Sequence, residues 1–153
     1  MSGFFETEER RAALLAELER WRGTPFVAHT ALCGVGVDCV RFAGTVLEAV
    51  GAIRPVVWPA YAIRGVGKGW RELIEVKLME ASRGVRFVAR GDEVCGDVLI
   101  LGGATGIVHA GVAGETGRWW HAMPRYGVRE SRLDDRNVMK HWLASWRVLE
   151  DQA

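Results

Sequence analysis

The sequence contains little cysteine, almost no net charge and no long apolar run, and each shortage excludes a class of protein. Its three cysteines are an odd number without the spacing of a disulfide framework, so we expect reduced thiols. Twenty basic side chains nearly balance nineteen acidic ones, which provides neither a basic footprint for nucleic acid nor an acidic tail. No segment approaches the roughly 18 apolar residues of a membrane span.

The length and the amino-terminal segment indicate how the chain is organised. A chain of 153 residues, 49% of them apolar, suits one domain with a real core. Residues 1–22 are charged and lack the unbroken apolar stretch of a secretory signal. We therefore expect synthesis in the cytoplasm, with delivery by something other than its own signal if the protein acts outside.

The most informative stretch is the glycine-rich loop that ends at Cys39 and opens a helix running to about Val50. One continuous apolar face is formed by Cys39, Phe42, Ala43, Val46, Leu47 and Val50. Asp38 is a good N-cap and Gly51 a good C-cap, so Cys39 would lie in the first helical turn. There the helix dipole and unpaired N–H groups favour a thiolate. A cysteine placed this way is either a small core residue or a nucleophile.

The remaining elements follow from apolar periodicity. It predicts helices over 6–21 and 70–81, with an irregular loop over 26–37 and a long surface connection over 54–69. After Gly84 the pattern changes to strands, which we expect over 85–89, 97–101, 107–113, 118–123, 128–133 and 146–149, with a short helical or coil segment over 134–144. Helices followed by an antiparallel sheet indicate an α+β fold.

A nucleophilic cysteine needs a base, and the base needs a group that orients its other ring nitrogen. The candidates are His29, His109, His121 and His141. His109 and His121 lie on the two arms of the hairpin predicted around 114–117. A loop of odd length centred on Glu115 would place them directly opposite each other on one face, whereas an even loop would place His121 opposite Ala110. The register is therefore the condition for a Cys–His–His triad, because either histidine alone also suits a structural role.

Several motifs, taken in order, resemble the NlpC-type cell-wall cysteine peptidases. The likeness extends over residues 21–149. In chain order, the motifs that carry it are Trp21-Arg22-Gly23-Thr24-Pro25-Phe26, Gly36-Val37-Asp38-Cys39, Gly96-Asp97-Val98-Leu99-Ile100-Leu101, His109-Ala110-Gly111-Val112 and Trp119-Trp120-His121-Ala122. The closing Trp146-Arg147 resembles the last strand of phage-tail-associated members of that family.

The resemblance implies a single papain-like cysteine peptidase domain over 1–153, with N-terminal helices packed on an antiparallel sheet. Cys39 would be the nucleophile, His109 the base and His121 the residue that orients it. The reaction would be attack on an amide carbonyl, followed by hydrolysis of a thioester, without a metal ion or other cofactor. The implied substrate is a peptidoglycan stem peptide. The implied setting is the cell wall or a phage-like particle, with tail proteins as partners.

The chain departs from the family's pattern at two places near the nucleophile. Phe26 stands where many members have tyrosine, and so lacks a hydroxyl that would help to hold the oxyanion. Val40-Arg41 replaces a Ser-Gly pair, which with the preceding aspartate helps to bind the free amine of the stem peptide. Asp38 is retained and is expected to hold a cationic group. These departures keep a second hypothesis open, a catalytically weak or inactive structural component of a tail tip; acyl transfer or a small amide substrate is a third.

The other notable residues have weaker functional interpretations. His29 is expected either to line the cleft or to be an ordinary exposed loop histidine. Trp119 would share the face of His121 and is a candidate cleft wall, with Trp120 on the opposite face, although core packing explains both. The C-x5-C spacing of Cys33 and Cys39 is not that of a structural zinc site. The glycine-rich run 65–69 lacks the spacing of a phosphate-binding loop.

Overall fold

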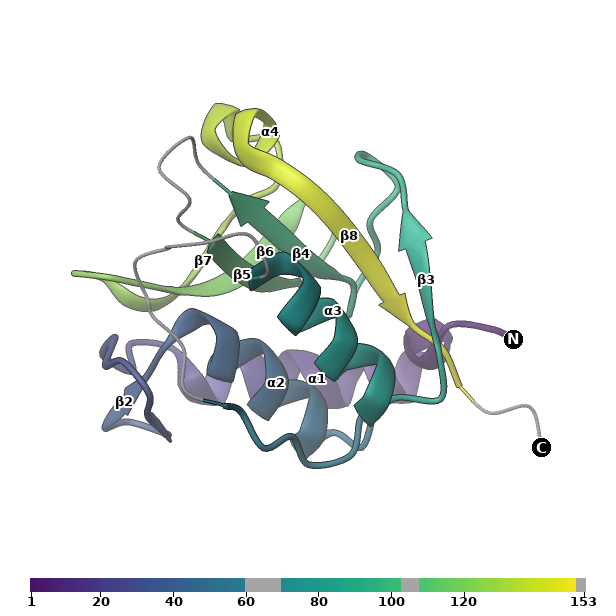
Figure 1. The fold of residues 1–153 in the computed structure, drawn as a ribbon. Helices are drawn as coiled ribbons and strands as arrows, with labels where there is room; N and C mark the ends of the chain where they lie inside the picture. The colour runs from purple at the N-terminus through teal and green to yellow at the C-terminus, as the bar shows by residue number, and fades with distance from the viewer. Residues whose placement is uncertain (60–69, 103–107, 151–153) are drawn as a thin grey trace.

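The computed structural model describes residues 1–59, 70–102 and 108–150 of the chain. It shows an α+β fold in which helices precede an antiparallel sheet, as predicted (Figure 1). The elements are η1 (Phe4–Glu6), α1 (Glu8–Trp21), β1 (Ala31–Leu32), β2 (Gly36–Val37), α2 (Cys39–Ala49), α3 (Trp70–Ala81), β3 (Val85–Val88), β4 (Val98–Gly102), β5 (Val108–Ala113), β6 (Arg118–Met123), β7 (Gly127–Arg132), α4 (Arg136–His141) and β8 (Trp142–Val148).

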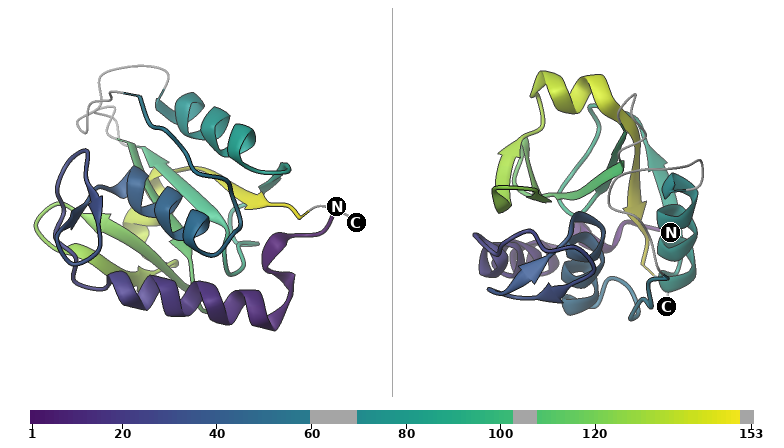
Figure 2. Two further views of the ribbon diagram at one scale, coloured as in Figure 1. Left: turned by 90° about the horizontal axis from the view of Figure 1, so that it is seen from below. Right: turned by 60° about the vertical axis from the view of Figure 1, so that its left-hand side comes forward.

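The six-stranded sheet has the order β3-β8-β4-β5-β6-β7, and every neighbouring pair of strands is antiparallel. Helices α1 and α2 cover one face of the sheet and α4 lies on the other, as the right-hand view of Figure 2 shows. The two ends of the chain meet beside β3 and β8, where Gly3 bridges Leu149 (Figure 1). No helix in the described ranges has the length and apolarity needed to cross a membrane.

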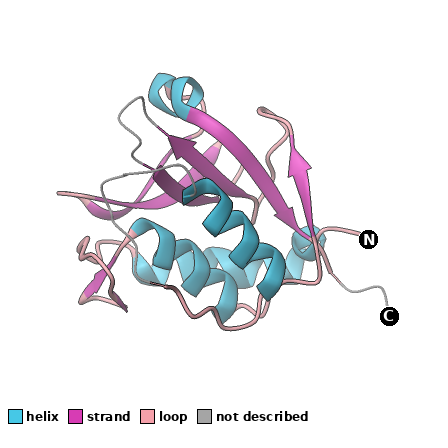
Figure 3. Cartoon of the chain, in the orientation of Figure 1, coloured by secondary structure: helices cyan, strands magenta, loops and turns pink. Residues whose placement is uncertain are grey.

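The core divides between these two faces because successive side chains of a strand point to opposite sides. On the helical face, Val112 and Trp120 pack against Leu14, Leu18 and Phe42. On the other face, Leu99, Leu101 and Trp119 pack with Val138 of α4. Figure 3 shows the helices in cyan and the strands of the sheet in magenta. Residues 109 and 121 belong to this second face, and Ala110 belongs to the first.

Helix α2 begins and ends where its sequence predicts. The Oδ1 atom of Asp38 accepts the backbone N–H of Arg41 at 2.8 Å, which makes Asp38 the N-cap and Cys39 the first helical residue. Beyond the helix, Gly51 has φ +79°, a left-handed conformation that glycine adopts without strain. The helix buries seven of its eleven residues, so the predicted apolar face is its packing face.

Some boundaries differ from those predicted. Helix α1 begins two residues later because the Oγ1 atom of Thr7 accepts the N–H of Arg10 and caps it. The loop over 26–37 contains the short hairpin β1–β2. Strand β8 begins at Trp142, four residues before the predicted start, because it pairs with both β3 and β4. Residues 60–69, with the glycine-rich run, lie outside the described part of the chain.

Candidate active site

The sulfur of Cys39 is held at the start of α2 against strand β5. The residue is 4% exposed. Burial, and to a lesser degree the carboxylate of Asp38, raises the pKa of the thiol to about 12. The nearby backbone of Ala110, Val40 and Cys39 itself opposes this shift without reversing it. At neutral pH the buried sulfur is therefore a neutral thiol.

The ladder between β5 and β6 stops short of Ala110. Both strands are described, and their ladder is confined to Val112↔Trp120 and Ala113↔Trp119. The N–H of Ala113 bonds to Asp97 next to β4, and the N–H of Gly114 bonds to Arg118 next to β6, so even-numbered N–H groups of β5 point toward β6. The N–H of Ala110 therefore points toward β6 beyond the end of this ladder, and Cys39 lies near it.

Next to Ala110, the side chain of His109 lies on the opposite face of the sheet and begins a hydrogen-bonded chain. Its Nε2 atom is 2.7 Å from Nδ1 of His121, and Nε2 of His121 is 2.8 Å from Oγ of Ser131. The indole of Trp119 stacks on His121, with ring centroids 3.9 Å apart and planes 11° from parallel. The two histidines thus form a rigid pair, and the free ring nitrogen of His109 is Nδ1.

The two histidines share one face of the sheet, although neither of the two registers considered above is the observed one. The loop is odd, but the ladder centres it on Thr116 and not on Glu115, so it places His121 across from Gly111 when continued. This shift leaves both histidines on the same face, because the side-chain period of a strand is two. The rings therefore meet diagonally between the two strands, with centroids 4.9 Å apart.

Both histidines are neutral at neutral pH. Burial lowers the pKa of His109 to about 4. Burial, then His109, then the guanidinium of Arg129 lower the pKa of His121 to about 2. A neutral His121 carries one ring proton. If that proton is on Nε2 and donated to Ser131, Nδ1 of His121 accepts from Nε2–H of His109, which leaves Nδ1 of His109 unprotonated as a base.

The thiol and the proposed base share no direct bond. Within the described residues, no hydrogen bond joins the Cys39 sulfur to His109. The sulfur lies near the backbone of Ala110, the residue that follows His109. Proton transfer from Cys39 to His109 therefore needs the two side chains to approach each other.

The other predicted site residues surround the cysteine in different ways. Asp38 is fully buried, and its Oδ2 atom accepts the N–H of His29 at 2.8 Å while Oδ1 caps the helix. Arg41 adds an ion pair at 3.7 Å. These contacts give Asp38 a structural role, and its binding of a cationic substrate group remains a prediction. His29 is an exposed residue with φ 59°. Phe26 is partly buried and packs against the apolar cluster that contains Cys39.

Trp119 and Trp120 face opposite sides of the sheet, as predicted. Trp119 is 1% exposed and lines a cavity of about 480 Å³ together with both catalytic candidates of the sheet, His109 and His121. Trp120 packs with the helices, beneath the guanidinium of Arg22. Trp119 therefore supports the histidine pair and also forms part of a cavity wall.

Sequence reasoning missed Ser131 and Arg129, which both come from β7. The β6–β7 ladder pairs Trp119 with Ser131 and His121 with Arg129. Both residues could have been predicted if the strands 118–123 and 128–133 had been paired as a second hairpin. That pairing places alternate residues of β7 on the same face as His121.

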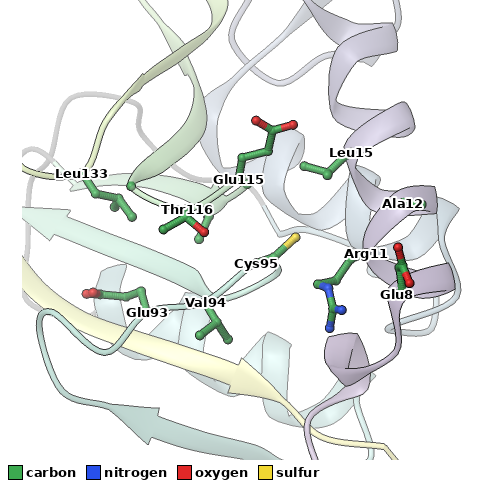
Figure 4. Close-up of a pocket in the computed structure, with 13 residues that line it drawn as sticks. Glu8, Arg11, Ala12, Leu15, Glu93, Val94, Cys95, Glu115, Thr116 and Leu133 are labelled. Atoms are coloured by element: carbon green, nitrogen blue, oxygen red, sulfur yellow. The ribbon is translucent and has the colours of Figure 1, made fainter.

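A larger cavity, of about 810 Å³, lies at the other end of the hairpin, away from Cys39. Figure 4 shows Cys95 there, between Leu15 and Arg11 of α1 and the hairpin tip at Glu115 and Thr116. No histidine is among the residues that line it. In the described ranges no three His, Cys, Asp or Glu side chains gather as they would around a metal ion.

Comparison with known proteins identifies the fold. No protein-family model and no curated protein matches the chain. Several solved structures, however, match the fold of this chain. An NLP/P60-family lipoprotein-like protein from Staphylococcus aureus superposes with TM-score 0.68 at 17% identity over 99% of this chain, and an NlpC/P60-family protein from Bacillus cereus with TM-score 0.63 at 19% identity over 92%. The chain spans only 45% and 40% of these two longer proteins.

Isolated domains match over almost their whole length. The NlpC/p60 domain of the peptidoglycan hydrolase SagA superposes with TM-score 0.57 at 22% identity, covering 92% of this chain and 98% of that domain. All these identities are below 25%, so they establish architecture. The chain has an NlpC/P60-like fold, in which N-terminal helices pack on a six-stranded antiparallel sheet.

Proposed function

We propose that this protein is a cysteine peptidase that cleaves peptidoglycan stem peptides, with Cys39 as nucleophile, His109 as base and His121 as the orienting residue. The observation that carries the proposal is the hydrogen-bonded His109–His121–Ser131 chain, with Cys39 at the start of α2 near the backbone of Ala110. The similarity to the NlpC/p60 domain of a peptidoglycan hydrolase supports the choice of substrate.

The geometry suits acyl transfer through a thioester. Nδ1 of His109 takes the thiol proton as the sulfur bonds to the amide carbonyl carbon. In this mechanism the N–H of Cys39, at the start of α2, stabilises the oxyanion that forms. The C–N bond then breaks, and His109 gives its proton to the departing amine. Water, deprotonated by His109, hydrolyses the thioester to a carboxylic acid and restores the thiol.

His121 and Ser131 act by positioning His109. The 2.7 Å bond between the histidines fixes the ring of His109, and the imidazolium that forms during the reaction donates its Nε2–H to His121. The stacked indole of Trp119 keeps the ring of His121 in place. This is the role of the third member of a catalytic triad.

We also propose that the peptidase acts at the cell wall as part of a phage-like particle, with tail proteins as partners. The support is the resemblance of Trp146-Arg147 to the last strand of tail-associated members. Those residues also stabilise this fold, since Arg147 forms a 2.9 Å ion pair with the buried Asp97. Identification of the protein in purified particles by mass spectrometry would test the setting, and its absence from them would refute it.

The test of the activity is digestion of purified peptidoglycan by wild-type protein, Cys39→Ala and Cys95→Ala, with released fragments identified by mass spectrometry. We expect wild type and Cys95→Ala to release stem-peptide fragments and Cys39→Ala to release none. Equal release by all three proteins would show that Cys39 is not the nucleophile. No release by any of them would favour the alternative of an inactive structural component, for which Phe26 and the missing Cys39–His109 bond argue.

A further inference from the structure

We propose that the 480 Å³ cavity beside the histidine pair binds a carboxylate on the leaving-group side of the substrate, with Arg129 as its anchor. This inference rests on the proposed peptidase function. It adds a recognition site for the amine-bearing half of the cleaved peptide, on the face of the sheet opposite α2.

The position of the cavity relates it to the leaving group. His109 and His121 form part of its wall, together with Ser131 of β7 and His141 of α4. The departing amine must receive its proton from His109, so the peptide segment that carries this amine must lie against His109. The cavity offers that segment a hollow bounded by the same imidazole.

Arg129 is an exposed residue that lines this cavity and brings a positive charge to its edge. It lies across from His121 in the β6–β7 ladder. Its guanidinium lies over the ring of Tyr126 at 5.1 Å and forms no ion pair or side-chain hydrogen bond with any residue of the described segments. A carboxylate is the natural partner of a guanidinium, because two parallel N–H groups match its two oxygens.

Two carboxylates close to α4 have other partners. Asp135 lines the cavity, and its Oδ1 atom accepts the N–H of Asn137 at 2.8 Å as the cap of α4. Asp134, next along the chain, forms a 2.6 Å ion pair with Arg132. Neither carboxylate forms an ion pair with Arg129, so an incoming anion would find the guanidinium unpaired.

The site also couples ligand binding to the catalytic pair. The charge of Arg129 is one of the causes that lower the pKa of His121. A carboxylate on Arg129 would cancel that repulsion when the histidine pair gains a proton. Substrate bound there would therefore assist the proton transfer that it requires.

The test compares two stem peptides in which a diamino acid provides the departing amine. The peptides differ in one group: the second carboxylate of that diamino acid is free in one and amidated in the other. The proteins are wild type, Arg129→Gln and Arg86→Gln, the last a control that removes a charge from an exposed residue of edge strand β3. We expect Arg129→Gln to raise KM at least about tenfold for the free acid and to leave the amidated peptide unchanged. Equal effects on both peptides, or no effect, would overturn the inference.

A binding measurement separates this inference from the peptidase proposal. Cys39→Ala and the double variant Cys39→Ala/Arg129→Gln are titrated with the free-acid peptide while the ring resonances of His121 are followed by NMR. Saturable shifts that require Arg129, without cleavage by wild type, would retain the site and reject the peptidase function. Cleavage by wild type without any Arg129-dependent shift would retain the peptidase and reject the site.

Discussion

Cys39 is buried and Cys95 is half-buried, and the two thiols have similar acidity and different surroundings. Burial raises the pKa of Cys39 to about 12 and that of Cys95 to about 11. Cys39 begins α2 and lies near the backbone of Ala110, the residue after His109, whereas Cys95 borders the larger cavity, with Arg11 nearby and no histidine among the described residues that line it. Thiol acidity in the resting fold therefore does not favour either cysteine. The proposal of Cys39 as the nucleophile depends on His109.

Removal of His109 should lower the cleavage rate most, because Cys39 would then lack a neighbouring base, as Cys95 does. We expect His109→Ala to lower kcat for wall-peptide cleavage by about 10²–10⁴-fold, the usual contribution of a general base. The measurement is steady-state cleavage of a stem peptide. Added imidazole should restore part of the activity to this variant and none to Cys39→Ala. A variant that keeps wild-type kcat would contradict the role of His109.

A hydroxyl at position 26 should increase the difference between the surroundings of Cys39 and Cys95, because it adds a hydrogen-bond donor near Cys39. Phe26 packs against the cluster that contains this cysteine. We expect Phe26→Tyr to raise kcat, by up to about 10²-fold if its hydroxyl reaches the oxyanion. Phe87→Tyr, at a side chain that is 49% exposed on β3, is the control for adding a hydroxyl elsewhere. Equal rates for wild type and Phe26→Tyr would mean that this position does not serve the oxyanion.

Loss of the Ser131 hydroxyl should have a moderate effect. His121 would lose the acceptor at 2.8 Å that selects its ring proton. One hydrogen bond contributes about 1 kcal/mol, so Ser131→Ala should lower kcat roughly fivefold, with KM unchanged and Ser131→Thr restoring the rate. Nitrogen NMR of His121 should show a changed tautomer population in Ser131→Ala. An unchanged population with a lowered kcat would assign Ser131 a merely structural role.

The smallest expected effect is on stability at alkaline pH, and it arises from the raised pKa that the two thiols share. Their folded pKa values lie above that of an unfolded cysteine, so the unfolded chain loses these protons first as pH rises above about 8.5. Stability should therefore fall between about pH 9 and 11, by up to about 1.4 kcal/mol per pH unit for Cys39. Urea unfolding of Cys39→Ala and Cys95→Ala should show a reduced alkaline slope in each. Unchanged slopes would mean that neither thiol is buried as described.

Local features of the sequence determine much of this arrangement. Asp38 and Gly51 fix the ends of α2, and the apolar face between them places Cys39 at the helix start. Strand alternation places His109 and His121 on one face. The exact pairing escaped prediction because it depends on the hairpin loop, where Gly117 at φ +78° shifts the loop centre to Thr116.

The rest of the site arises from contacts between distant segments. The end of the β5–β6 ladder short of Ala110 has no local sequence signal. Ser131 and Arg129 join the histidines only when β7 pairs with β6. The start of β8 at Trp142 was missed because Leu143 is partly exposed and Ser145 is buried, which breaks the apolar alternation of a half-buried strand.

The mechanism proposed above requires that His109 activates Cys39, whereas Cys95 has no histidine beside it. Alkylation by iodoacetamide at pH 7, followed by peptide mapping, measures both thiols in one sample. We expect Cys39 to be labelled faster than Cys95 in wild type, and His109→Ala to slow labelling of Cys39 at least about tenfold without changing that of Cys95. Equal labelling of the two thiols, or a Cys39 rate that does not depend on His109, would contradict this mechanism.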